Sequence, residues 1–116
     1  MKKIIAANWK QNGNHKLLTK LARDIGAGVS KLKNKPNIIL LPPSLYIDSI
    51  SKDLKKNKYH KFIKMGTQNI SAYENGAYTG EISVDMIKDF ECPYVLIGHS
   101  ERRHIFMESD ALISKK

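Results

Sequence analysis

Short apolar runs alternate with segments of helical periodicity along this chain of 116 residues, and this alternation limits its possible folds more than any other feature. Four runs have the length and composition of buried strands: 3–8, 37–41, 61–65 and 94–97. In the first helical segment, the apolar stripe is expected at Leu17, Leu18, Leu21, Ile25, Val29 and Leu32. Parallel strands need such helical crossovers, so the pattern predicts an α/β fold with a parallel sheet.

Two parallel architectures fit this order of elements. A doubly wound sheet that binds a dinucleotide usually carries a G-x-G-x-x-G turn after its first strand, and this chain has none there. The other architecture is a (β/α)8 barrel, which needs about 250 residues. On that interpretation, residues 1–116 supply the first four βα units, the N-terminal half of a single barrel domain, with a further helix starting near Ser109.

The formal net charge of +9 is divided unevenly along the chain. Residues 1–66 carry +12 and residues 67–116 carry −3. Such asymmetry can indicate nucleic-acid binding, but few aromatic residues lie among these lysines. We therefore expect a solvated basic surface without a nucleic-acid site, which would also steer an anionic substrate towards the protein.

Other features exclude several classes of site. Cys92 is the only cysteine and the four histidines lack the spacing of metal ligands, so we expect no disulfide, metal or other cofactor. No apolar run reaches the roughly 20 residues of a membrane-spanning helix, so we expect no membrane association. A cytoplasmic location is the prediction that follows.

Polar residues follow the expected strands where their carboxyl ends should meet: Asn8, Lys10, Gln68, Asn69, His99, Ser100 and Glu101. The Lys10 ammonium could stabilise a phosphate or a developing oxyanion. His99 lies at the start of an expected short helix, where imidazolium is disfavoured, so a neutral, hydrogen-bond-donating ring is expected. Glu101 could hold Lys10 in place. Taken singly, each of these residues also fits a structural or solvent-exposed role.

Four motifs make the interpretation specific. They are 8–13 (NWKQNG), 66–69 (GTQN), 75–83 (NGAYTGEIS) and 97–103 (IGHSERR). In order and spacing they resemble segments of the triosephosphate isomerase family. The resemblance implies a (β/α)8 barrel that interconverts dihydroxyacetone phosphate and glyceraldehyde 3-phosphate in glycolysis and gluconeogenesis, without a metal or cofactor.

The resemblance also implies roles for individual residues. Asn8 and Lys10 would bind the substrate, and Lys10 would stabilise the enediolate charge. Neutral His99 would polarise the carbonyl groups and move a proton, and Glu101 would position Lys10. These roles make His99, Lys10 and Glu101 the expected catalytic residues.

A homodimer is implied as well. The loop at 75–81 would insert into a second subunit, with Thr79 reaching the partner subunit's Asn8 and Lys10. Gln11 lies at the family's dimer contact, where an apolar residue is usual, so the strength of that contact is open.

In the family, the general base is a glutamate after the sixth strand, and a lid and phosphate loops follow it. We expect these parts to lie beyond residue 116, because Glu108 belongs to the fourth βα unit. The 116-residue chain alone is therefore expected to be inactive and, with open strand edges, poorly soluble or self-associating. One alternative is a noncatalytic half-barrel that acts as an interaction module, and another is a basic nucleic-acid binder on a βα scaffold.

Overall fold

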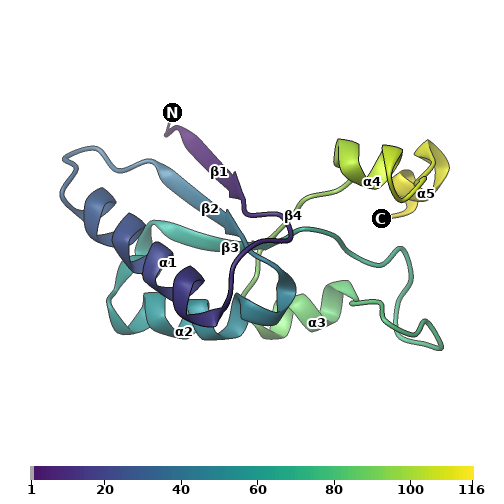
Figure 1. Ribbon diagram of the computed structural model, residues 1–116, viewed down its shortest axis with the longest axis horizontal. Coiled ribbons are helices and arrows are strands. Elements are labelled where there is room, and N and C mark those ends of the chain that lie inside the picture. The colour runs from purple at the N-terminus through teal and green to yellow at the C-terminus, as the bar shows by residue number, and fades with distance from the viewer. Residues whose placement is uncertain (1) are drawn as a thin grey trace.

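The computed structural model describes residues 2–116, in which four parallel strands alternate with helices (Figure 1). The strands are β1 (Ile4–Asn8), β2 (Asn37–Leu41), β3 (Ile63–Thr67) and β4 (Tyr94–Val95). The α-helices are α1 (His15–Ser30), α2 (Ile47–Lys56), α3 (Val84–Asp89), α4 (Ser100–His104) and α5 (Asp110–Lys115), and short 3-10 helices cover Ser44–Tyr46 (η1) and Tyr59–Lys61 (η2). The strand order is β1-β2-β3-β4. A curled sheet of this topology confirms the expected first βα units of a (β/α)8 barrel.

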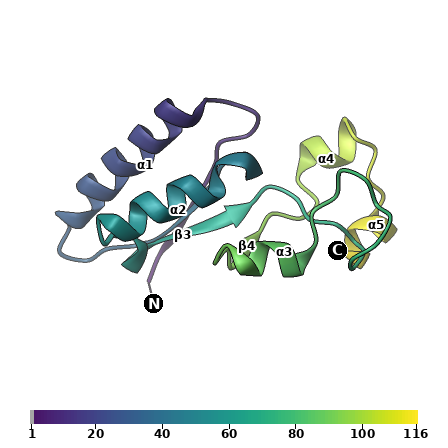
Figure 2. The same cartoon turned by 90° about the horizontal axis from the view of Figure 1, so that it is seen from below.

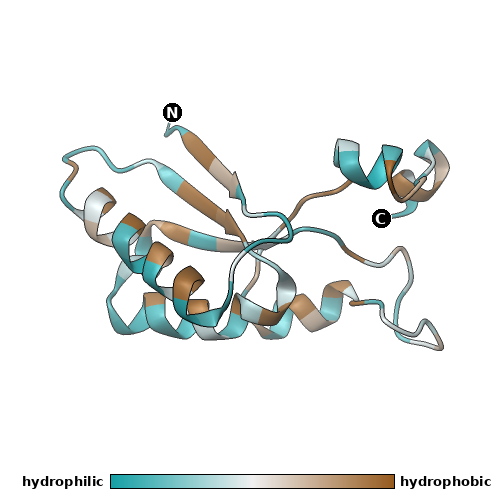
Figure 3. Cartoon of the chain, in the orientation of Figure 1, coloured by the Kyte–Doolittle hydropathy of each residue, from teal (hydrophilic) through white to brown (hydrophobic). Residues whose placement is uncertain are grey.

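One face of the sheet carries the core. Helices α1, α2 and α3 lie on the same side of the strands (Figures 1 and 2). Leu40, Ile63 and Met65 pack from β2 and β3 against Ile50 and Leu54 of α2. Figure 3 shows the apolar residues concentrated in the strands and on the sides of α1 and α2 that face them.

The apolar stripe of α1 is narrower than its sequence indicates. Asn14 caps the helix by accepting a hydrogen bond from the Leu17 N–H (2.9 Å). The buried line then runs through Leu18, Ala22 and Gly26, whereas Leu17, Leu21 and Leu32 of the expected stripe are exposed. Small residues are buried on this side of α1 because α2 and η2 pack closely against it. The contact is tertiary, so the local sequence pattern does not reveal it.

The third strand begins two residues later than expected. Residues Tyr59–Lys61 form η2, so β3 starts at Ile63. Gly66 therefore lies within the strand and does not end it. A Cβ at Gly66 would lie 3.0–3.2 Å from the side chains of Leu41 and Ile39, so a larger residue would crowd the second face of the sheet. The fourth strand is shorter than expected and ends at Val95.

The expectation that all four strands are buried is wrong for β1. Ile4 and Ile5 are 62% and 52% exposed, whereas β2 is buried from Ile38 to Leu41. Within residues 2–116, β1 and β4 each pair with only one other strand, so both are sheet edges. The radius of gyration is 15.0 Å, compared with about 13 Å for a compact chain of this length. The molecule is thus an open half-barrel.

Candidate active site

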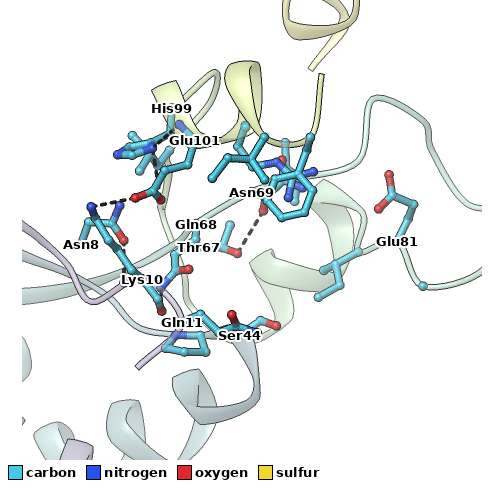
Figure 4. Close-up of a pocket in the computed structure, with 18 of the residues that line it drawn as sticks. Asn8, Lys10, Gln11, Ser44, Thr67, Gln68, Asn69, Glu81, His99 and Glu101 are labelled. Carbon is cyan, nitrogen blue, oxygen red and sulfur yellow. Dashed lines mark hydrogen bonds and ion pairs between the residues drawn. The ribbon is translucent and has the colours of Figure 1, made fainter. Parts of the chain in front are cut away.

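A pocket of about 710 Å³ lies at the carboxyl ends of the strands (Figure 4). The four residues to which the sequence analysis gave catalytic or substrate-binding roles all line it: Asn8, Lys10, His99 and Glu101. They follow β1 and β4, which are about 90 residues apart in sequence. Because all the strands run parallel, their carboxyl ends lie on the same side of the sheet. The structure therefore brings the predicted catalytic and substrate-binding residues together.

Lys10 makes an ion pair at the floor of this pocket. Its Nζ lies 2.7 Å from Oε1 of Glu101, and both side chains remain about half exposed. The hydrogen bond from Lys10 holds the pKa of Glu101 below its ordinary value; partial burial opposes this shift, and the charge of Lys10 reinforces it. Glu101 is thus an ionised partner that orients the ammonium towards the pocket.

The backbone at Lys10 is in a conformation that disfavours a side chain. Its φ is 54°, in the left-handed region, which costs a non-glycine residue on the order of 1–2 kcal/mol. Its N–H donates to Oδ1 of Asn8 (2.9 Å). Strain of this kind persists only where the surrounding contacts maintain it.

Gln68 supplies one of those contacts. Its Nε2 donates to the carbonyl oxygens of Lys10 and Leu41, both at 2.8 Å, and so joins the loops after β1, β2 and β3. The sequence places Gln68 at a strand end but gives no sign of this role. Only the three-dimensional arrangement brings its amide to a backbone 58 residues away.

His99 is positioned by the turn between β4 and α4. Gly98 has a φ of 67°, and a Cβ there would lie 3.0 Å from Arg103 Nη2 and from Ile113 Cγ2, so glycine is required. His99 then caps α4, because its Nδ1 accepts a hydrogen bond from the Glu101 N–H (3.1 Å). Oε2 of Glu101 is farther from the same Nδ1, at 3.5 Å.

This contact assigns the tautomer of His99. A nitrogen that accepts from an N–H carries a lone pair, so the ring is neutral with its proton on Nε2. The Nε2–H remains as the hydrogen-bond donor of the ring, and His99 lines the pocket. The expected neutral histidine is therefore consistent with the geometry around Nδ1.

A second polar cluster supports the far wall of the pocket. The Lys116 Nζ donates to Oδ1 of Asn69 and to Oε2 of Glu108, both at 2.7 Å, and Arg102 donates to the same Glu108 oxygen. Burial raises the pKa of Glu108, but the hydrogen bonds from Lys116 and Arg102 lower it by more. The pKa of Glu108 therefore lies below its ordinary value. Glu108 does not line the pocket, although its neighbour in the cluster, Asn69, does.

The two residues expected at a dimer contact lie apart within one chain. Gln11 is exposed and lines the pocket, and Thr79 is exposed on the loop between β3 and α3. Tyr73 and Tyr78 stack at 4.4 Å within that loop, and Gly80 has a φ of 90°. The loop extends away from the sheet in Figure 1.

No three histidine, cysteine, aspartate or glutamate side chains in residues 2–116 are grouped so that they could hold a metal ion. None of the helices described combines the length and the apolar character needed to cross a membrane.

Comparison with known proteins agrees with the motifs around this pocket. The sequence model of the triosephosphate isomerase family matches residues 3–116. The chain belongs to this family. Triosephosphate isomerases of Shewanella denitrificans and Shewanella piezotolerans are 43% and 42% identical to it over 117 aligned positions. Each match covers 97% of the chain but 44% of the relative, so the chain spans less than half the length of these enzymes.

Membership of the triosephosphate isomerase family explains the open sheet. The matched part of each relative is less than half of an enzyme whose family fold is a closed eight-stranded barrel. The four strands described here correspond to the first four strands of that barrel.

Proposed function

We propose that this chain carries the electrophilic part of a triosephosphate isomerase site, which interconverts dihydroxyacetone phosphate and glyceraldehyde 3-phosphate. The observation that supports this most strongly is the convergence of Lys10, Glu101 and a neutral His99 on one pocket. A cation and an N–H donor at a shared opening suit a carbonyl oxygen on which negative charge develops.

In this proposal the substrate carbonyl oxygen accepts from the His99 Nε2–H and faces the Lys10 ammonium. A general base removes a proton from the carbon next to the carbonyl group, and the electron pair moves to the carbonyl oxygen to give an enediolate. His99 moves a proton between the two oxygens of the enediolate. The base then returns its proton to the former carbonyl carbon, and the carbon that was deprotonated first becomes the new carbonyl carbon. Lys10 and Glu101 keep the local charge balanced throughout.

The general base is not assigned to residues 2–116. The carboxylates that line the pocket are Glu81 and Glu101, and Glu101 is engaged by Lys10. The family resemblance places the base in a glutamate after the sixth strand, so we propose that neither Glu81 nor Glu101 is the base and that residues outside this chain supply it. The 116-residue chain then has no isomerase activity alone, because losing a general base costs about 10²–10⁴ in rate.

Two further parts of the proposal follow the resemblance. The exposed loop at 75–81 would insert into a partner subunit, with Thr79 reaching Asn8 of the partner subunit and Lys10 of the partner subunit. The enzyme would act in the cytoplasm, where its triose phosphate substrates are metabolised.

A chimera tests the proposed roles. Residues 1–116 would replace the matching part of the Shewanella denitrificans enzyme, to which they align over 97% of their length. We expect the chimera to isomerise glyceraldehyde 3-phosphate, and Lys10→Ala and His99→Ala each to lower kcat/KM by at least about a hundredfold. Lys16→Ala, a helix-surface change, is the matched control. A folded chimera whose activity survives both site substitutions would refute the assignment.

A noncatalytic half-barrel that acts as an interaction module is the second candidate. The exposed apolar side chains of β1 favour it. This candidate predicts that the chimera is inactive. It also predicts that Lys10→Ala and His99→Ala leave the association of the 116-residue chain with its binding partner unchanged.

A further inference from the structure

A second pocket, of about 450 Å³, is lined by residues of α2, η2, β3, α3 and the turn into β4, and we call it the amino-end pocket. Its buried apolar floor includes Leu54 of α2 with Ile63 and Met65 of β3. Because β3 is paired with β2 on one side and with β4 on the other, this pocket does not lie at an edge of the sheet. Ile63 begins β3 and Pro93 immediately precedes β4, so the pocket lies towards the amino ends of the strands, away from the candidate active site.

Three lysines from three different elements line the amino-end pocket. Lys55 lies in the last turn of α2, Lys64 in β3 and Lys88 in the last turn of α3. Lys88 reaches Asp85 only at 4.0 Å, and both of these side chains are exposed, so their pairing contributes little. Among the lining residues, Glu91 is the one carboxylate. The carboxyl ends of α2 and α3 each add about half a negative charge, so the lysines still outweigh the negative groups around them.

Glu91 is held against Lys55 in a strained backbone conformation. Its Oε2 pairs with the Lys55 Nζ, and the hydrogen bond and charge of Lys55 keep the pKa of Glu91 below its ordinary value. Its φ of 51° is in the left-handed region, at the position after the cap of α3 where glycine is usual. The two side chains are 46% and 65% exposed, so the pair is weak and open to exchange with an anion from solution.

His60 contributes a group that needs a further partner. It comes from η2 and lines the amino-end pocket, and its carbonyl oxygen accepts from the Lys64 Nζ (2.9 Å). The ring Nδ1 is shielded from solvent and has no hydrogen-bond partner within residues 2–116. Buried polar atoms are almost always paired with protein, water or ligand, so this nitrogen favours a pocket that takes up a polar molecule.

We propose that the amino-end pocket binds a small phosphate monoester, with Lys55 and Lys88 as donors to the phosphate and the carbon body against the apolar floor. Glu91 would then leave Lys55 when the ligand binds. A free monocarboxylate gains nothing over Glu91, which has a high effective concentration within the same chain. A phosphate monoester carries about two negative charges at pH 7 and can displace it. This site is separate from the candidate active site and does not depend on the proposed isomerase activity.

Histidine ring resonances can report on the two pockets separately, because His60 lines the amino-end pocket and His99 lines the candidate active site. Phenyl phosphate would be titrated into the 116-residue chain, with the His60 signal assigned from the spectrum of His60→Gln. We expect a saturable shift at His60 and weaker binding of inorganic phosphate, which lacks a carbon body. A shift at His99 alone, no saturable shift at His60, or equal affinity for the two probes would overturn the proposal. The same titration in the chimera, which retains residues 51–93, decides the question if the chain precipitates.

Substitutions around the amino-end pocket test the role of each charge. Lys55→Ala and Lys88→Ala should each raise the Kd for phenyl phosphate about tenfold, because each removes a charge-assisted hydrogen bond. Lys52→Ala is the matched control, since Lys52 lies on the same helix, pairs with Asp48 and does not line the pocket. Glu91→Gln should lower the Kd about two- to fivefold, because the competing carboxylate is lost. A Kd that either pocket lysine variant leaves unchanged, or that Glu91→Gln does not lower, would contradict the assignment.

Discussion

At the scale of single residues, Gln68 holds the pocket together. Its amide satisfies the Lys10 and Leu41 carbonyls, and through Lys10 it maintains a backbone with a φ of 54°. Because Lys10 is already ordered at the pocket, substrate binding would not have to offset the conformational entropy of ordering it.

We expect Gln68→Ala to lower the free energy of unfolding by about 1–3 kcal/mol, because the Lys10 carbonyl loses the Gln68 donor and the Leu41 carbonyl keeps only the Trp9 N–H. In the chimera it should also lower kcat/KM by about tenfold to a hundredfold through misplacement of Lys10. Urea titration and initial-rate measurements check the two effects. Lys16→Ala, a change on the exposed surface of α1, is the control. Equal effects of the two substitutions would remove the special role of Gln68.

Glu108 is the residue whose ionisation should matter most for stability. Its pKa is lowered in the folded chain, so the stability it contributes is present above its ordinary value of 4.5 and is lost as the pH falls below that value. Glu108→Gln should cost about 3–5 kcal/mol at pH 7, because it leaves Lys116 and Arg102 without their shared carboxylate. The loss should shrink as the pH approaches 3, as measured by urea titration at each pH. A loss that is the same at both pH values would contradict the account.

The residues of the site differ in how far the sequence reveals them. Asn8, Lys10, His99 and Glu101 were predicted because they follow apolar runs and lie in recognisable motifs. The hydrogen bonds of Gln68 and the network of Lys116, Glu108 and Asn69 were not, because they join positions that no local pattern relates.

At the scale of elements, α1 shows why two glycines in one helix have different effects. A Cβ at Gly26 would lie 2.2 Å from the ring of Tyr59, whereas a Cβ at Gly28 would have no heavy atom within 4 Å. The close approach of η2 to α1 therefore depends on Gly26, and Gly28 only weakens the helix.

Substitution by alanine should separate the two positions. We expect Gly28→Ala to raise the free energy of unfolding by about 0.5–1 kcal/mol, because alanine stabilises a helix interior relative to glycine. Gly26→Ala should lower it by about 1–3 kcal/mol through crowding of Tyr59. Thermal unfolding of the two variants checks the opposite signs. Destabilisation by both changes would show that α1 needs flexibility at Gly28.

The order and type of the elements could be predicted from the sequence because each apolar run and each helical stripe is a local signal. The burial of each element could not. The run at 3–8 has the composition of a buried strand, but Ile4 and Ile5 are exposed because β1 is an edge. Likewise, η2 displaces the start of β3 to Ile63, and this displacement depends on packing against α1 and α2.

At the scale of the whole molecule, residues 2–116 form an open half-barrel whose pocket is lined by Lys10, His99 and Glu101. The pocket needs only the carboxyl ends of the strands, so it forms although the sheet is not closed. The proposed catalysis would need a base and a closed, water-poor site in addition to Lys10 and His99.

The isomerase rate of the 116-residue chain beside that of the chimera tests this account most directly. Both would be assayed with glyceraldehyde 3-phosphate at equal concentrations of folded protein. The account predicts a chimera that turns over and a chain whose rate cannot be distinguished from that of its own Lys10→Ala variant. A chain that turns over within tenfold of the chimera, with Lys10→Ala abolishing that activity, would contradict it and would mean that a base lies within residues 1–116.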